Sequence, residues 1–104
     1  MIDPELKQKW IEALQSGEYV KGHGRLREPG DEENSEKYCC LGVLADISEL
    51  GEWAGPVYVI EDFDYEGYFG TRVGLSVSTM MCLADINDRT DDFDEVIGMI
   101  RGVA

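Results

Sequence analysis

The stretch from Tyr38 to Leu50, YCCLGVLADISEL, decides the fold because it is the most apolar segment of the 104-residue chain. Its apolar side chains recur every three or four residues, which predicts a central helix with a broad buried stripe. Gly42 stands inside that stripe at a cost of about 1 kcal/mol relative to Ala. A glycine kept there often lets another backbone approach closely. Gly51 is expected to end the helix.

A first helix is predicted upstream of this segment. Asp3 suits the N-cap position, Pro4 suits the first helical position, and Gly17 suits a C-terminal cap. Between them, an apolar face recurs at helical spacing, made of Leu6, Trp10, Ile11 and Leu14.

Two more helices are predicted downstream. Ser76 or Ser78 caps the third helix, and Asn87-Asp88 is expected to break it. Thr90 or Asp91 caps the last one. Its apolar face comprises Phe93, Val96, Ile97 and Ile100.

The remaining segments predict short strands. Residues Glu18 to Arg27 are extended, with turns at Gly22 and Gly24. Val57 to Ile60 forms a strand, and Gly67 followed by Tyr68-Phe69 indicates the return strand. The expected fold is therefore an α+β single domain, residues 1–104, with about four helices and one or two short β-hairpins.

The charge of the chain limits its partners. Twenty-two Asp and Glu face nine Lys and Arg, a net charge of −13. This balance argues against direct binding to nucleic acid or to an anionic membrane, and favours a cationic partner. No apolar run is long enough to cross a bilayer, and the N-terminus lacks the features of a signal peptide. A cytoplasmic location is expected.

The carboxylates fall into three clusters. The first lies in an expected acidic loop over residues 28–37, the second at the tip of the predicted hairpin, and the third leads into the last helix. If they share one face, they would present carboxylates much as a duplex presents phosphates. The expected partner-binding residues are Glu61, Asp62, Asp64, Tyr65, Glu66, Asp88, Asp91, Asp92, Asp94 and Glu95.

The three cysteines are expected to be reduced thiols that mostly act as small core hydrophobes. Cys39 and Cys40 are adjacent and Cys82 stands alone, a count and spacing that do not suit a disulfide framework. A zinc site needs further ligands at recognisable spacings, which Cys82 and His23 do not supply. No cofactor and no metal is therefore expected, and packing is favoured over a Cys–His nucleophilic pair.

Two further patterns favour ordinary structural roles. His23, in GHGRL with Arg25, is expected to be an exposed turn histidine, with an anion- or ligand-binding site as the alternative. Residues 85–92, DINDRTDD, have the carboxylates of a calcium loop. They lack its central glycine and its bidentate glutamate, so an inter-helix turn with Asx capping is favoured.

Three segments together resemble a family of small uncharacterised proteins of bacteriophages and prophages. They are LKQKWIEALQSGEY (6–19), YCCLGVLADI (38–47), and GLS (74–76) followed by LADINDRTDDFDEVIGMI (83–100). The resemblance implies a phage origin and an intracellular host setting, and it supplies no catalytic residues. Small accessory phage proteins often block host defence systems.

The leading hypothesis is a non-enzymatic protein that inhibits a host defence or nucleic-acid-processing protein, of the anti-CRISPR or anti-restriction type. It would bind the basic nucleic-acid-binding surface of that protein, as a nucleic-acid mimic. The alternatives are a phage structural or accessory protein whose acidity serves solubility, and a small ligand-binding domain that uses His23 and Arg25. The oligomeric state stays open.

Overall fold

The central helix predicted from the apolar segment is present as α2, Cys40–Ser48, in a computed structural model that describes residues 2–23, 26–28, 30, 35–61, 63–65 and 69–103. Its first six residues, 40–45, are all buried. A Cβ on Gly42 would lie 1.7 Å from the carbonyl oxygen of Leu26. The expected close backbone approach at this glycine is thus confirmed.

The helix α2 ends earlier than predicted. Glu49 adopts a left-handed conformation, with φ 56°, directly after Ser48. Gly51 serves another purpose, because a Cβ there would lie 2.0 Å from the carbonyl oxygen of Val59. The absence of a side chain at Gly51 lets the following strands pack close to the helix end.

The first helix, α1, spans Pro4–Gln15 as expected. The Asp3 carboxylate accepts a hydrogen bond from the Leu6 amide at 3.3 Å, and Gly17 follows the helix with φ 79°. The buried Trp10 indole donates to the carbonyl oxygen of Cys40 at 2.8 Å. This bond ties the middle of α1 to the start of α2.

The third helix, α3, spans Val77–Arg89, and the prediction that Asn87-Asp88 breaks it is wrong. Ser76 is the N-cap and accepts from the Thr79 amide at 3.1 Å. Asn87 is fully buried. Its carboxamide bonds to groups of other segments, described below, so it does not compete with the backbone of its own helix.

The last helix, α4, spans Asp94–Arg101 and buries the predicted apolar face of Phe93, Val96, Ile97 and Ile100. The expectation that Thr90 or Asp91 caps it is wrong. Phe93 occupies the N-cap position without a side-chain hydrogen bond, because a phenyl ring has no acceptor atom, and its ring belongs to the core. The Asp92 carboxylate accepts from the Asp94 amide at 3.0 Å instead.

A first sheet is built from three two-residue strands in the order β1-β3-β2: β1 Val20–Lys21, β2 Arg27–Glu28 and β3 Lys37–Tyr38. β1 runs parallel to β3, and β2 runs antiparallel to it. Glu28 pairs with Lys37. The two ends of the expected 28–37 loop are therefore strand residues.

A second, antiparallel sheet has the order β4-β5-β6: β4 Glu52–Ala54, β5 Val57–Ile60 and β6 Phe63–Tyr65. The predicted strand Val57–Ile60 is confirmed, but the return strand lies earlier than expected. Glu61, with φ 49°, makes a tight turn that pairs Ile60 with Phe63. Phe69, expected in a strand, begins the 3₁₀-helix η1, Phe69–Val73, and is fully buried. Gly67 and Tyr68 lie outside the described residues.

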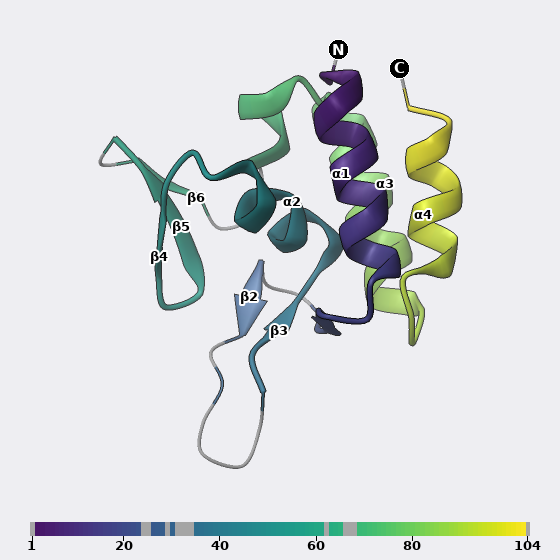
Figure 1. Ribbon diagram of the computed structural model, residues 1–104, viewed down its shortest axis with the longest axis horizontal. Helices are drawn as coiled ribbons and strands as arrows, with labels where there is room; N and C mark the ends of the chain where they lie inside the picture. The colour runs from purple at the N-terminus through teal and green to yellow at the C-terminus, as the bar shows by residue number, and fades with distance from the viewer. Residues whose placement is uncertain are drawn as a thin grey trace.

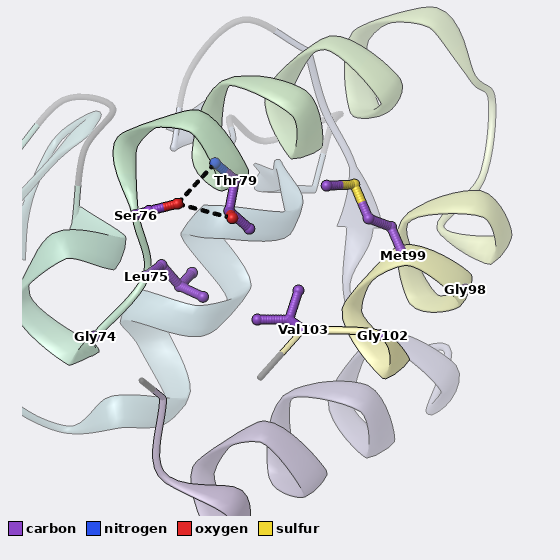
Figure 2. A pocket seen from close by; sticks show the side chains of 8 residues that line it. All are labelled: Gly74, Leu75, Ser76, Thr79, Gly98, Met99, Gly102 and Val103. Carbon is purple, nitrogen blue, oxygen red and sulfur yellow. Dashed lines mark hydrogen bonds between the residues drawn. The ribbon is translucent and has the colours of Figure 1, made fainter.

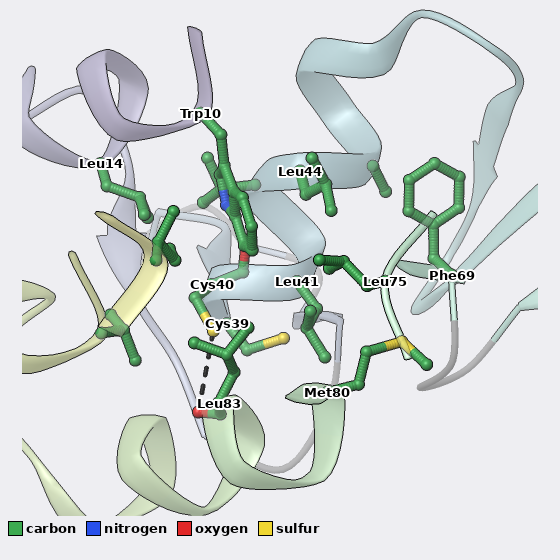
Figure 3. Close-up of a cluster of buried hydrophobic side chains, with 14 of the residues drawn as sticks. Trp10, Leu14, Cys39, Cys40, Leu41, Leu44, Phe69, Leu75, Met80 and Leu83 are labelled. Atoms are coloured by element: carbon green, nitrogen blue, oxygen red, sulfur yellow. Dashed lines mark hydrogen bonds between the residues drawn. The ribbon is translucent and has the colours of Figure 1, made fainter. Parts of the chain in front are cut away.

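All four α-helices of the described residues contribute to one core. Together with the two small sheets, they confirm the α+β class. In Figure 1, α1, α3 and α4 lie at one end of the long axis and the β4-β5-β6 sheet lies at the other, with α2 between them. Figure 3 shows side chains of this core gathered around α2, with Trp10 and Leu83 on opposite sides of Cys40. No helix among the described residues is long and apolar enough to span a membrane.

Candidate functional site

The third acidic cluster forms a compact surface where α3 ends and α4 begins, at the lower right of Figure 1. We call this surface the acidic corner. All five of its side chains are exposed. They are Asp88, Asp91, Asp92, Asp94 and Glu95.

Hydrogen bonds fix the turn that carries the acidic corner. The Thr90 hydroxyl donates to the carbonyl oxygen of Ile86 at 2.8 Å and lies 3.1 Å from that of Asp92. The Asx-type bond from the Asp94 amide to Asp92 completes the turn. The carboxylates therefore project from a defined backbone.

Most of the charge of the acidic corner is not neutralised by ion pairs within the described residues. In the part of the chain that the structure describes, Asp91, Asp92, Asp94 and Glu95 make no ion pair. The nearby Arg89 pairs with Asp85 at 2.9 Å, one turn earlier in α3. The corner thus keeps a concentrated negative field that is open to solvent.

A single lysine supports the corner from the side of the first sheet. The Lys21 ammonium donates to the carbonyl oxygens of Asn87 and Thr90. Both oxygens lie at the C-terminal end of α3, where the helix dipole favours a cation. Lys21 thereby stabilises the backbone on which the carboxylates stand.

His23 is an exposed turn residue beside strand β1, as predicted. Its Nε2 atom lies 3.1 Å from the Lys21 ammonium and 3.3 Å from the carbonyl oxygen of Thr90. Arg25, its expected partner in a ligand site, lies outside the described residues. The described contacts of His23 are thus with Lys21 and Thr90, two residues that stabilise the backbone of the acidic corner.

A hollow of about 370 Å³ opens beside the acidic corner, between the end of α1 and the start of α4. Its lining includes the apolar residues Leu14 and Phe93 and a second aromatic residue, Tyr19. Burial and, to a smaller extent, a hydrogen bond to Asp46 raise the pKa of Tyr19, so its hydroxyl stays neutral. The complete lining comprises Leu14, Gln15, Gly17, Tyr19, Lys21, Asp91, Asp92, Phe93 and Asp94.

The second acidic cluster lies at the opposite end of the molecule. The β5–β6 turn that carries Glu61 is at the far left of Figure 1, away from the acidic corner. Glu61 is exposed and lies 3.9 Å from the Arg72 guanidinium. Asp62 and Glu66 lie outside the described residues; Asp64 and Tyr65 belong to β6, but their side chains are not described. The expected binding residues that the structure describes therefore divide into two separate groups.

The described members of the first acidic cluster are partly neutralised. Glu36 accepts from the Arg27 guanidinium at 2.8 Å and from the Tyr38 hydroxyl at 3.1 Å. The Arg27 guanidinium also lies over the Trp53 ring, 5.3 Å from its centroid. Residues 31–34 lie outside the described part of the chain.

The cysteines are free thiols, and two of the three are structural. Cys39 caps α2 and accepts from the Gly42 amide at 3.3 Å, while Cys40 is fully buried. Burial raises the pKa of the Cys39 thiol to about 11 and that of Cys40 well above its ordinary value. Neither is therefore a ready nucleophile at neutral pH. Cys82 differs from the expectation of a core residue, because it is exposed on α3.

Residues 85–92 do not form a calcium loop. The segment 85–89 belongs to helix α3, so the Asp85 and Asp88 side chains project from a helix. The Asx-type turn at Asp92 agrees with the predicted inter-helix turn. No cluster of three or more His, Cys, Asp or Glu side chains within the described ranges has the geometry to hold a metal ion.

A second cavity, of about 650 Å³, lies between the start of α3 and the end of α4 (Figure 2). The hydroxyls of Ser76 and Thr79 bond to each other at 2.9 Å. None of the described side chains that line this cavity is ionisable, so none of them supplies an acid or a base. Its lining consists of Gly74, Leu75, Ser76, Thr79, Gly98, Met99, Gly102 and Val103.

Sequence reasoning did not find the residues that support the acidic corner. Lys21 reaches it across more than sixty positions of sequence, Tyr19 lines the hollow beside it, and nothing in their local pattern indicates either placement. Asn87 carried the clearest available signal, because a polar residue in line with the apolar residues Leu83 and Ile86 needs hydrogen-bond partners in the core. Its partners themselves were not predictable.

These features define the class of the protein: a small α+β domain with an acidic corner and, in its described part, no metal-binding cluster. Residues 2–66 match the model of a domain family of unknown function, DUF8296, and the chain belongs to that family. The match covers α1, α2 and all the strands of both sheets, and it stops before α3 and the acidic corner. No curated protein and no solved structure matches the chain.

Proposed function

We propose that the chain is a non-catalytic binding protein that docks its acidic corner on a basic surface of another protein. The observation that carries this proposal is the set of exposed carboxylates at the corner, of which Asp91, Asp92, Asp94 and Glu95 make no ion pair within the described residues. Such a field attracts a cationic surface over long distances and favours fast association.

The partner that we propose is a host defence or nucleic-acid-processing protein, which the chain would inhibit. Proteins of that kind carry basic channels that bind phosphates, and a fixed array of carboxylates can occupy such a channel. The net charge of −13 and the resemblance to small phage proteins support this choice. The site of action would then be the host cytoplasm.

One specific observation bears on the accessory-protein alternative. The exposed Glu61 of the β5–β6 turn and the acidic corner lie at opposite ends of the long axis, so the described carboxylates of the second and third clusters do not share one face. A partner that contacts the corner alone fits this arrangement. Acidity that serves only solubility fits it too, and an experiment must separate the two.

A pair of charge-matched variants makes that separation. Asp91→Lys with Glu95→Lys reverses the charge at the corner, and neither side chain makes a hydrogen bond within the described residues. Glu12→Lys with Glu52→Lys makes the same change of net charge on α1 and β4, where both carboxylates are exposed. If the corner is the docking surface, only the first variant loses its partner in a pull-down from bacterial lysate. Equal retention by both variants would leave solubility as the role of the charge.

A further inference from the structure

The hollow beside the acidic corner has the chemistry of a site for one guanidinium group. Its lining includes the acidic residues Asp91, Asp92 and Asp94 together with the aromatic residues Tyr19 and Phe93. We propose that this hollow receives an arginine side chain of the partner protein. This inference rests on the proposed function and names the group that the corner recognises.

The charges that line the hollow favour a cation. Three carboxylates and one ammonium line it. That ammonium, on Lys21, is already held by the carbonyl oxygens of Asn87 and Thr90. The three carboxylates make no ion pair within the described part of the chain, so an incoming cation meets acceptors that are not yet neutralised.

The shape of the hollow favours arginine over a metal ion or lysine. The described acidic side chains do not come together as metal ligands. A volume of about 370 Å³ suits an organic group. A planar guanidinium can stack on an aromatic ring while it donates to carboxylates in a fork, whereas an ammonium cannot stack in that way.

The apolar residues of the lining would contact the aliphatic part of the same side chain. Leu14 and Phe93 line the hollow and are 6% and 7% exposed, so they offer it a small apolar surface. An arginine that enters would cover this surface with its methylene groups and direct its charged end to the carboxylates. The apolar and acidic residues of the lining therefore suit the two chemically different parts of one side chain.

The test is a titration of the ¹⁵N-labelled protein with the blocked peptide acetyl-Gly-Arg-Gly-amide, followed by NMR. We expect shifts of the amides and rings that line the hollow. The same peptide with citrulline, which is similar in shape but neutral, should cause none of them. Shifts spread over all acidic clusters, or equal shifts with the lysine peptide, would overturn the arginine site.

Neighbouring carboxylates provide the matched control. Asp94 lines the hollow and Glu95 does not, although both are exposed in the first turn of α4. Asp94→Asn should weaken the affinity for the arginine peptide about fivefold, the size expected for one exposed ion pair. Glu95→Gln should weaken that affinity less than about twofold. Melting curves confirm that both variants fold.

The outcomes separate this inference from the proposed function. Equal weakening by both variants would contradict the hollow as the site and leave the acidic corner as a docking surface. If neither variant changes the binding and the charge-reversed corner variant keeps its partner, both proposals fail. Selective weakening by Asp94→Asn supports the arginine site.

Discussion

At the scale of single residues, the core depends on two positions that bring distant backbone segments together. Gly42 leaves room for the carbonyl group of Leu26 against α2. Asn87 accepts from the Cys40 amide at 3.1 Å and donates to the carbonyl oxygen of Gly22 at 3.0 Å. The missing side chain at Gly42 and the polar side chain of Asn87 thus allow α2, α3 and the first sheet to pack together.

Two glycine substitutions should change stability in opposite directions. Gly42→Ala places a Cβ 1.7 Å from a carbonyl oxygen and should cost at least about 3 kcal/mol, since the crowding atom belongs to the backbone. Gly98→Ala, on the exposed side of α4 with no atom within 4 Å of the new Cβ, should stabilise by about 0.5–1 kcal/mol. Urea unfolding of both variants measures this, and a stable Gly42→Ala protein would refute the close approach.

Asn87→Ala should destabilise the fold by about 3 kcal/mol. The substitution leaves the Cys40 amide and the Gly22 carbonyl buried without these partners, each at a cost of roughly 1–3 kcal/mol. Asp85→Ala on the same helix removes only an exposed i,i+4 ion pair and should cost less than about 0.5 kcal/mol. Similar losses in the two variants would show that Asn87 is not a junction.

The helices could be predicted from the sequence, but most of the contacts that hold them together could not. Helical spacing located α1, α2 and the apolar face of α4 because each pattern lies within one short segment. The partners of Asn87 are forty-seven and sixty-five positions away, and the parallel pairing of β1 with β3 joins residues seventeen positions apart. The acidic corner was predicted from local charge, but the hollow beside it needs Leu14 and Tyr19 from another part of the chain.

At the scale of secondary-structure elements, two lysines cap the C-terminal ends of α3 and α4. Lys21 bonds to the end of α3, and Lys7 donates to the carbonyl oxygens of Arg101 at 3.1 Å and Val103 at 2.6 Å. Both are long-range contacts in which a cation meets the negative end of a helix dipole. Both ammonium groups keep their charge and donate in these contacts to backbone carbonyl oxygens and not to carboxylates.

Removal of each cap should loosen one helix end only. Lys7→Met should speed amide hydrogen exchange in the last turn of α4, and Lys21→Met should do so at the end of α3, each with a loss of about 1 kcal/mol. Lys9→Met, an exposed lysine of α1, should change neither. Uniform acceleration over the whole chain in a capping variant would contradict a local role.

At the scale of the whole molecule, a thiol and a phenol group that the fold shields from water make its stability sensitive to high pH. Burial raises the pKa of Cys39 from 9.0 to about 11; burial and a hydrogen bond to Glu36 raise that of Tyr38 from 10.0 to about 12. Because the folded pKa lies above the unfolded one, this contribution to stability is complete below about pH 9. It is lost as the pH rises through 11 and 12.

The free energy of unfolding should therefore stay level from pH 7 to 9, apart from the effect of other groups, and fall between pH 9 and 12. Tyr38→Phe should be less sensitive in the upper part of that range, since it removes one of the groups that must ionise. Urea unfolding at successive pH values checks this. A stability that is constant up to pH 12 would show that these groups are not protected by the fold.

The same scale contains the central claim, that the acidic corner is a docking surface for a basic protein. Its electrostatic attraction should weaken steeply with ionic strength, since the corner is open to solvent and screening acts over about 10 Å at 0.1 M salt. The overall charge of −13 alone would give a salt dependence too. The location of the charge is therefore what an experiment must resolve.

The most direct measurement is a quantitative pull-down from bacterial lysate at 50 and 300 mM salt, with the wild type and the two charge-matched variants in parallel. The account predicts a basic partner that the wild type and the Glu12→Lys/Glu52→Lys variant retain at low salt. The Asp91→Lys/Glu95→Lys variant should lose that partner at low salt. High salt should release the partner from the wild type and from the Glu12→Lys/Glu52→Lys variant. A partner held equally by the corner variant, or held undiminished at 300 mM salt, would contradict the claim.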